Sequence, residues 1–278
     1  MRITLQKTLL YAGIYAVLAV VVILSLGPLL WVVMSSFKTN SAILSSPFSL
    51  PTGFDLQPYV KVLTGNNFLM FAANSFIIAS VSTLLSLLIF SMSGYVLAKY
   101  RFPGRQLLFV LFAITLLVPG HTKTQPIFTI IMRLSLYNTR AGLILVYLTG
   151  GLAMSMFILR SSFNSIPKEI SEAAFIEGAG FMRNFFQMNL PLAKGGLATC
   201  GIMMFLGNWN EYYFAALLTS SPQNRTLPYA LAFFNETFAY DYTRMFAALT
   251  IVILPGILLY AITQEQVQMS VASGSVKG

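Results

Sequence analysis

Long stretches without any charged residue alternate with short groups of basic residues along this chain. Residues 8–37 and 62–98 contain no Asp, Glu, Lys or Arg. A helix needs about 20 predominantly apolar residues to cross a bilayer. The two stretches therefore predict two membrane-spanning helices, at about 9–34 and 69–97.

The first stretch has an alternative interpretation as a cleaved secretory signal, with cleavage near Ala16 or Ala19. The apolar region of such a signal is about 7–15 residues long, and the uncharged stretch 8–37 is much longer. We therefore interpret it as a first span that stays in the mature protein.

Four further apolar stretches predict four more spans. They lie at about 106–119, 141–159, 195–218 and 245–264. Pro119 and Gly120 end the third span, because proline and glycine interrupt helices. Residues 124–137 are apolar but contain Arg133, which favours a short interfacial helix on the outer side. The whole pattern predicts an all-α, polytopic membrane protein, a single domain of six transmembrane helices over residues 1–278.

The composition agrees with a membrane location. The chain is 56% hydrophobic and 9% charged, with a mean hydropathy of +0.75, whereas about a quarter of the residues of a soluble protein are charged. The net charge of +9 raises the possibility of nucleic-acid binding. The basic residues, however, lie between apolar stretches, which fits cytoplasmic loops and anionic lipid headgroups. Nucleic acid is therefore not an expected partner.

The distribution of Lys and Arg predicts that both termini are cytoplasmic. With six spans in this orientation, ten of the 17 basic residues lie inside and seven lie outside. The tight loop KYRFPGR, residues 99–105, has three basic residues in seven, and short loops have the largest effect on orientation.

The counts of reactive residues exclude several kinds of chemistry. One cysteine, Cys200, rules out an internal disulfide, and one histidine, His121, rules out metal sites built on two histidines. No Lys precedes Ser or Thr within the glycine spacing of a P-loop, so any ATP chemistry has to belong to a partner. We expect no catalytic, cofactor-binding or metal-binding residue in this chain and no enzyme activity of its own.

The loop 161–194, between predicted spans four and five, is the most informative segment. Pro167 followed by Glu169 is typical of a first helical turn. Gly178 and Gly180 predict the end of that helix. The loop therefore predicts a short cytoplasmic helix between two membrane spans.

Small and apolar side chains in this loop predict contact with another protein. Ala174 and Gly178 are four residues apart and so share one helical face, where small side chains allow close approach. Phe175 and Phe181 are candidate apolar anchors for a groove on the partner. After a turn, Leu190-Pro191 redirects the chain into predicted span five. The alternative is an ordinary solvated helix.

The same loop resembles the signature loop of ABC importer permeases, EAA-x3-G-x9-I-x-LP. It reads Glu172-Ala173-Ala174, then Gly178, then Met188-Asn189-Leu190-Pro191. Met188 replaces the usual Ile and Glu177 a frequent Asp, and both keep the chemical type. The resemblance implies that the loop docks into a cleft of a cytoplasmic ATPase and transmits its movement. The residues expected to dock are Glu172, Ala173, Ala174, Phe175, Glu177, Gly178, Leu190 and Pro191.

Shorter pieces extend the resemblance over almost the whole chain, which is similar to the maltose-transporter permease group of carbohydrate importers. These pieces are SSFK (Ser35–Lys38), Asn74-Ser75, Asn138-Thr139, Trp209-Asn210-Glu211, Thr226–Pro228 and the tail Gly274–Gly278. In that family the tail reaches toward the ATPase dimer, which implies contacts by Ser275, Val276 and Lys277.

The resemblance also implies a set of partners in a bacterial cytoplasmic (inner) membrane. They are a second permease, expected to be a different chain; two cytoplasmic ATPase subunits that bind ATP and Mg²⁺; an extracellular or periplasmic solute-binding protein; a carbohydrate; and the lipid bilayer. The implied mechanism is alternating access, in which the solute crosses between the two permeases and this chain binds no cofactor.

Polar and aromatic residues in predicted span five are candidates for the solute pathway. Asn208, Glu211 and Tyr212 share a helical face there, with Trp209 and Asn210 beside them. They fit a polar and aromatic lining for a sugar, and they fit an interfacial aromatic belt equally well.

Aromatic residues in the predicted outer loop 219–244 are candidates for contact with the solute-binding protein, because the corresponding loop of relatives reaches that protein. The candidates are Arg225, Phe233, Phe234 and Tyr240. The alternative is an amphipathic surface segment.

The main alternative function is a secondary transporter that works alone on an ion gradient. It would need acidic residues deep in its spans, and predicted spans one to four and six contain none. The chain also has no inverted repeat of the kind from which many such carriers are built. A membrane enzyme is a third possibility, but one histidine and two aspartates, Asp55 and Asp241 in predicted outer loops, leave little for hydrolytic chemistry.

Overall fold

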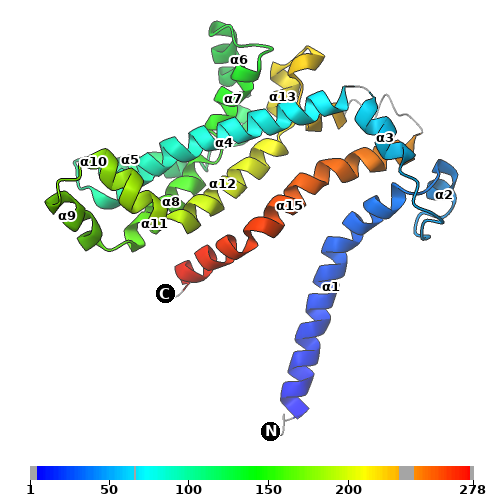
Figure 1. The fold of residues 1–278 in the computed structure, drawn as a ribbon, viewed down its shortest axis with the longest axis horizontal. Coiled ribbons are helices and arrows are strands. Elements are labelled where there is room, and N and C mark those ends of the chain that lie inside the picture. The colour runs from blue at the N-terminus through cyan, green and yellow to red at the C-terminus, as the bar shows by residue number, and fades with distance from the viewer. Residues whose placement is uncertain (1–4, 66, 232–240, 276–278) are drawn as a thin grey trace. The chain divides into compact units, whose positions relative to one another are not determined.

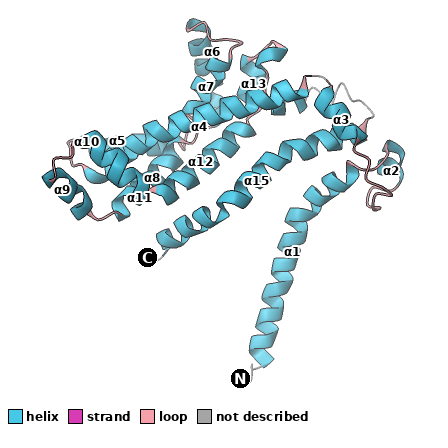
Figure 2. Ribbon diagram, viewed as in Figure 1, coloured by secondary structure: helices cyan, strands magenta, loops and turns pink. Residues whose placement is uncertain are grey.

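The computed structural model describes residues 5–65, 67–231 and 241–275 of the chain. Within these ranges the regular elements are helices and no strand occurs (Figure 2). The expected all-α class is therefore confirmed. The longest helices coincide with long uncharged stretches of the sequence (Figure 1). They are α1 (Leu5–Ser35), α4 (Phe68–Lys99) and α15 (Tyr242–Ser275).

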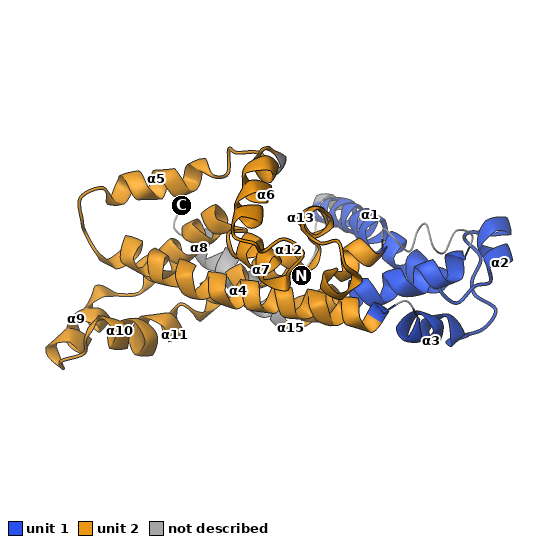
Figure 3. Cartoon of the chain, turned by 90° about the horizontal axis from the view of Figure 1, so that it is seen from above, with its two compact units in different colours: residues 1–68, 231–254 blue, residues 69–230, 255–278 orange. Residues whose placement is uncertain are grey.

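The chain forms two compact units (Figure 3). Unit 1 comprises residues 1–68 and 231–254, and unit 2 comprises residues 69–230 and 255–278. The long helix α15 begins in unit 1 and ends in unit 2, with Pro255 inside the helix at the boundary.

Unit 1 contains α1, two short helices and the first part of α15. The short helices are α2 (Asn40–Ser45) and α3 (Gln57–Thr64). Trp31 of α1 packs edge-on against Phe246 of α15, with ring centroids 5.1 Å apart. This aromatic contact joins the C-terminal part of α1 to the start of α15 within the unit.

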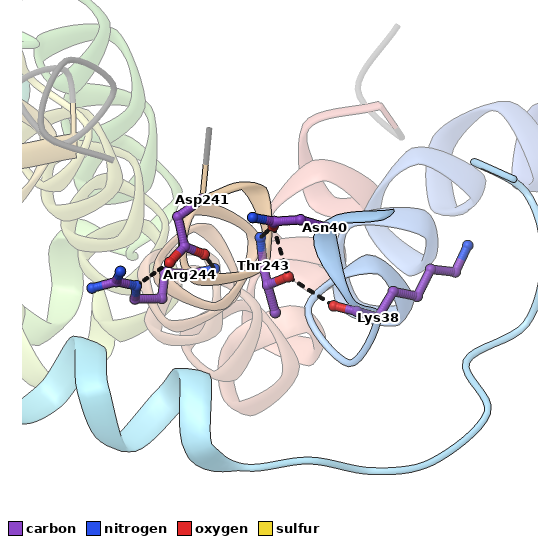
Figure 4. A network of polar contacts seen from close by, with 5 residues as sticks. All are labelled: Lys38, Asn40, Asp241, Thr243 and Arg244. Carbon is purple, nitrogen blue, oxygen red and sulfur yellow. Dashed lines mark hydrogen bonds and ion pairs between the residues drawn. The ribbon is translucent and has the colours of Figure 1, made fainter. Parts of the chain in front are cut away.

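The start of α15 is also tied to the link between α1 and α2 (Figure 4). The Thr243 hydroxyl donates to the carbonyl oxygen of Lys38 at 2.8 Å, and the Thr243 N–H donates to Asn40 Oδ1 at 3.1 Å. Arg244 forms an ion pair with Asp241 in the same turn. The Lys38 ammonium group donates to two other carbonyl oxygens, and the residue is only 5% exposed. The SSFK piece of the sequence thus anchors the start of α15.

Unit 2 contains the remaining helices (Figure 1). They are α5 (Arg105–Ile114), η1 (Gly120–Lys123), α6 (Thr124–Arg133), α7 (Arg140–Leu148), α8 (Leu152–Ser165), α9 (Lys168–Ile176), α10 (Phe181–Arg183), the π-helical turn η2 (Asn184–Asn189), α11 (Leu190–Leu192), α12 (Lys194–Trp209), α13 (Tyr213–Leu218) and η3 (Pro222–Asn224). One core cluster includes Tyr95, Phe163 and Phe185, and a second includes Leu143 and Ala215. The first holds the loop between α8 and α12, and the second holds α7 against α13.

Three helices among the described residues are long and apolar enough to cross a membrane. They are Leu10–Ser35, Phe68–Lys99 and Tyr242–Ile262. Two bent pairs, α7 with α8 at 53° and Phe181–Leu192 with α12 at 80°, raise the number to five if each counts as one span. Helix α5 has 10 residues, about 15 Å at 1.5 Å per residue, or half of the hydrocarbon thickness. The six-span topology stays a prediction.

Three predicted spans differ from the helices that form. Predicted span four, 141–159, is divided between α7 and α8, which end and begin on either side of residues 149–151. In predicted span three, 106–119, the α-helix stops at Ile114, because the next turns tighten to bonds between residues three apart before Pro119. Predicted span five, 195–218, is interrupted, because α12 ends and α13 begins on either side of Glu211. A continuous apolar stretch in the sequence therefore conceals a break in the helix.

Candidate coupling loop and solute pathway

The loop between α8 and α12 contains a short helix, α9, that starts and ends where the sequence predicts. Pro167 precedes its first turn, and Glu169 supplies an acidic side chain in that turn. Gly178, just beyond its other end, has φ +82°, and two N–H groups after the helix donate back to carbonyl oxygens of the last turns. This is a Schellman motif, which favours glycine because other residues are strained at positive φ.

The side of α9 that packs against η2 is made of small side chains. Ser171 and Ala174 are buried on this side. Ala174 is therefore covered by its own chain, which contradicts the expectation that it lies on an open face with Gly178. The exposed side carries Phe175 and Ile176, which are 46% and 88% exposed. The other exposed members of the expected docking set are Glu172, Ala173, Glu177 and Gly178.

Two buried asparagines, which no sequence motif marks, hold η2 against α9. Asn184 and Asn189 are both 0% exposed. Nδ2 of Asn189 lies 2.9 Å from Oδ1 of Asn184, 3.1 Å from the Asn184 carbonyl oxygen and 3.1 Å from Ser171 Oγ. Buried polar groups are costly without partners, so this network favours one arrangement of the loop. The available signal was the segment NFFQMN, in which three polar residues, two of them asparagines, alternate with apolar ones.

An aromatic cluster joins the same loop to α4 and α8. The centroid of the Tyr95 ring lies 5.7 Å from that of Phe181, 5.2 Å from that of Phe185 and 5.5 Å from that of Phe163. Tyr100 completes the cluster at 5.7 Å from Tyr95. Each such pair contributes about 0.5–1.5 kcal/mol beyond its buried area. Phe181, expected to be an anchor for a partner, is instead an internal contact of this chain.

The expected change of direction after the loop is observed. Leu190 and Pro191 open α11, and the chain turns by 80° between Phe181–Leu192 and α12. Leu190 packs partly against the aromatic core cluster, whereas Pro191 is exposed. Of this pair, Leu190 therefore supports the loop from inside and Pro191 lies on its surface.

A second group of candidate residues lies where two interrupted helices meet. Helices α7 and α8 are separated at Gly151, which has φ +72°, and α12 and α13 are separated at Glu211. Glu211 accepts hydrogen bonds from the N–H groups of Phe214, at 2.8 Å, and Ala215, at 3.1 Å. The Tyr147 hydroxyl donates to the same carboxylate at 2.5 Å. Glu211 therefore caps α13 and ties it to α7.

Hydroxyl groups of α4 stabilise the broken end of α7. Ser82 and Ser86 donate to backbone carbonyl oxygens of α7, the bond from Ser86 to Leu148 being 2.7 Å long. Asn208 of α12 donates from Nδ2 to Thr83 Oγ1 at 3.3 Å. Backbone groups without partners in a bilayer cost several kcal/mol each, and these side chains supply hydrogen-bond partners beside the bend.

A cavity of about 780 Å³ lies beside this junction. Its lining is mostly apolar and includes Met203, Met204 and Phe214, with polar groups from Asn208 and Glu211. Amide and carboxylate groups above an apolar wall can bind the hydroxyls and the ring face of a sugar.

The other expected pathway residues lie elsewhere. Trp209 is buried against the ring of Phe205, Asn210 is exposed and Tyr212 stacks on Tyr229. The expected shared face of Asn208, Glu211 and Tyr212 does not form, because the helix ends at Trp209.

Motif residues that are far apart in the sequence meet at the loop 219–228. Oδ1 of Asn138 accepts from two consecutive N–H groups of this loop, at 3.0 and 2.9 Å. Nδ2 of Asn74 donates to two of its carbonyl oxygens, at 2.8 and 2.9 Å, and Ser75 Oγ accepts from the N–H of Leu227 at 2.8 Å. These motif residues therefore fix the course of a loop.

The remaining expected site residues are partly described. The Arg225 guanidinium group lies over the Tyr229 ring, 4.5 Å from its centroid, and Ser275 is the last residue of α15. Phe233, Phe234, Tyr240, Val276 and Lys277 lie outside the described residues.

Comparison with known families decides the class of the protein. A family described as the inner membrane component of binding-protein-dependent transport systems matches residues 90–272, well over half of the chain. This chain belongs to that family. The resemblance to ABC importer permeases, first indicated by the loop 172–191, is therefore confirmed, and the protein is a membrane component of a transport system.

Relatives of this transport family cover nearly the whole chain. The diacetylchitobiose uptake system permease protein NgcG of Streptomyces coelicolor is 37% identical over 95% of this chain and 88% of that protein. The trehalose transport system permease protein SugB of Mycobacterium tuberculosis is 31% identical over 96% of this chain and 98% of that protein. A chain of a bacterial ABC transporter involved in the import of the acidic polysaccharide alginate has the same fold, with a TM-score of 0.83 at 22% identity over 95% of this chain and 99% of that one.

Proposed function

We propose that this chain is one of two permease subunits of an ABC importer for a carbohydrate in a bacterial cytoplasmic membrane. Relatives named for the uptake of diacetylchitobiose and trehalose support a carbohydrate as the solute. In this proposal α5 and the residues up to 119 form the third of six spans, and both termini are cytoplasmic. Two partner subunits bind ATP and Mg²⁺ and hydrolyse the ATP, because this chain has no P-loop.

The exposed side of α9 is the proposed docking surface for an ATPase subunit. Phe175 and Ile176 are large apolar side chains that project from a loop helix flanked by Glu172 and Glu177. Full burial of one such side chain contributes about 1.5–3 kcal/mol. This exposed apolar pair, on the helix of the EAA loop, carries the docking proposal.

The packing behind this surface supports transmission of movement. The asparagine network holds α9 to η2, and the Tyr95 cluster holds the loop to α4 and α8. A force applied to α9 therefore moves these elements together. In the proposed cycle, closure of the ATPases on ATP pushes the loop and turns the pathway outward.

The cavity beside Glu211 is the proposed surface for the carbohydrate, with the second permease on its other side. Asn208 and Glu211 supply the polar groups and Phe214 an apolar wall. The loop with Arg225, together with Phe233, Phe234 and Tyr240, is proposed to meet the solute-binding protein. The tail Ser275–Lys277 is proposed to meet the ATPases.

The docking proposal is tested by Ile176→Ser, with Phe48→Ser as the matched control. Both side chains are almost fully exposed, 88% and 87%, but Phe48 belongs to unit 1. We expect Ile176→Ser to insert normally and to recover at least about tenfold less ATPase on purification, since about 1.5 kcal/mol of contact is removed. Equal recovery from the two variants contradicts the proposal. Gly178 is a less specific test, because its positive φ makes any substitution strained.

Reconstituted uptake separates the importer from a secondary transporter. Uptake by the proposed importer requires ATP, the second permease and the ATPases, and a protonophore leaves it unchanged. Uptake by the purified chain alone, abolished by a protonophore, would establish the opposite assignment.

A further inference from the structure

Basic side chains outnumber acidic ones where α4, α5 and α8 meet, with Glu169 of α9 close to Lys99. No acidic residue occurs between Asp55 and Glu169, so α4, α5 and α8 carry positive side chains and no negative one. Arg101 and Arg105 lie at the link between α4 and α5, and Arg160 lies near the end of α8. The region therefore has a local excess of positive charge.

Two basic residues of this region have structural roles at helix ends. Lys99 donates from Nζ to the carbonyl oxygen of Ile166 at 2.6 Å, just beyond α8. Arg105 donates from Nε to the carbonyl oxygen of Leu97 at 2.8 Å, near the end of α4. Cations are favourable at the carbonyl end of a helix. The bond to Leu97 also holds the Arg105 guanidinium group in place beside the end of α4.

Within the described part of the chain, the guanidinium group of Arg160 has no such role at a helix end. It stacks on the ring of Phe109 in α5, 4.0 Å from the centroid. Its Nε is buried and has no acceptor among the described residues, and the charge of Arg105 is close enough to repel it. A buried donor beside a second cation is unfavourable by itself. An anion that reaches both guanidinium groups would stabilise the arrangement.

We propose that Arg105 and Arg160 bind the phosphate of an anionic phospholipid, with Arg101 at the rim of the site. The inference rests on the membrane topology of the proposed function, in which all three lie at the cytoplasmic headgroup level. Arginine binds phosphate with two parallel hydrogen bonds, and basic sites between spans on the cytoplasmic side suit lipid headgroups. Leu107 and Leu111 are 63% and 49% exposed and give the acyl chains an apolar surface on α5, the helix that begins at Arg105.

The test uses the full-length chain, purified in detergent with the subunits that accompany it, and phosphatidylglycerol as the probe. Binding is measured from the rise in unfolding temperature during lipid titration and from the lipid retained on purification. Arg105→Gln combined with Arg160→Gln should weaken binding about 25-fold, about fivefold for each charge removed. Arg133→Gln, an exposed basic residue of α6 at the outer side in the proposed topology, is the matched control and should retain binding.

Several outcomes overturn the inference. The inference fails if the double variant binds phosphatidylglycerol as well as the unaltered chain does. It fails also if the Arg133→Gln control loses as much of this binding as the double variant. If inorganic phosphate raises the unfolding temperature as much as phosphatidylglycerol does, the site binds a free anion. If the double variant loses the second permease on purification but retains the lipid, the arginines belong to a protein interface.

A second variant keeps the inference testable if the double variant does not fold. Arg160→Lys retains the charge but not the planar, stacked group, so we expect it to lose part of the binding, and full retention overturns the role of Arg160. Recovery of the ATPase and ATP-driven uptake are measured on the same preparations. They test the proposed function independently of the lipid site.

Discussion

Replacement of Asn189 by leucine tests whether the buried asparagine network keeps the loop between α8 and α12 rigid. Leucine has nearly the shape of asparagine but no hydrogen-bonding group. The change removes the contacts of Nδ2 with Asn184 and Ser171, which are 2.9–3.1 Å long. It leaves the acceptor oxygens of Asn184 buried without this donor.

The expected magnitude follows from the groups left behind. A buried polar group that loses its partner costs about 1–3 kcal/mol. The Ser171 hydroxyl can rotate toward another acceptor, so the two Asn184 oxygens account for most of the loss, about 3 kcal/mol in total. A tenfold change corresponds to about 1.4 kcal/mol, so the open population of the loop should rise about 150-fold.

Hydrogen exchange of the backbone amides of residues 171–189 measures this opening. Gln187→Leu is the matched control, because Gln187 lies on the same loop but is exposed, where its side chain accepts from Arg183 at 3.0 Å. The control should change exchange by less than about threefold, since exposed polar contacts contribute little. If exchange in Asn189→Leu also stays within that range, the network does not hold the loop. In the proposed importer the variant should lose more transport than ATPase activity.

Two further predictions concern the helices that lead from this loop. Gly196→Val should lower the unfolding temperature in detergent, because an added Cβ would lie 2.8 Å from Ser162 Cβ and overpacking costs about 1–3 kcal/mol. The control Gly195→Val should leave the unfolding temperature unchanged, because nothing lies within 4 Å of its added Cβ. Equal shifts in the two variants refute the contact with Ser162. Tyr147→Phe and Glu211→Gln, combined in a double-mutant cycle of unfolding free energies, should show a coupling of about 0.6–1.7 kcal/mol, as such cycles give for hydrogen bonds between membrane helices. Additive effects would mean that the 2.5 Å bond contributes nothing.

Features that depend on neighbouring residues along the chain were predictable from the sequence. Pro167 and Gly178 mark the two ends of α9 because helix capping is local chemistry. The long apolar helices were likewise predictable, because the bilayer requires an apolar stretch of a definite length. The spacing of the EAA loop led correctly to the family.

Features that depend on what covers a side chain were not predictable in this way. Ala174 and Phe181 have the small and aromatic side chains expected at a partner interface, but both pack against their own chain. Glu211 lies in an apolar stretch that predicts an unbroken helix, yet its carboxylate binds the N–H groups of α13 and the hydroxyl of Tyr147. In each case the partner is far away in the sequence or depends on a break that hydrophobic periodicity does not show.

The positions of α8 and α12 link the loop to the cavity. Helix α8 runs from the bend at Gly151 to the loop, and α12 runs from the loop to the bend at Glu211. They are about 21 and 24 Å long at 1.5 Å per residue, and they pack against each other. We infer that movement of the loop displaces this pair as one body. The displacement changes the backbone at the two bends, because the helical backbone is interrupted there and side-chain hydrogen bonds hold it instead. The cavity beside the bends therefore changes shape, while neither helix deforms.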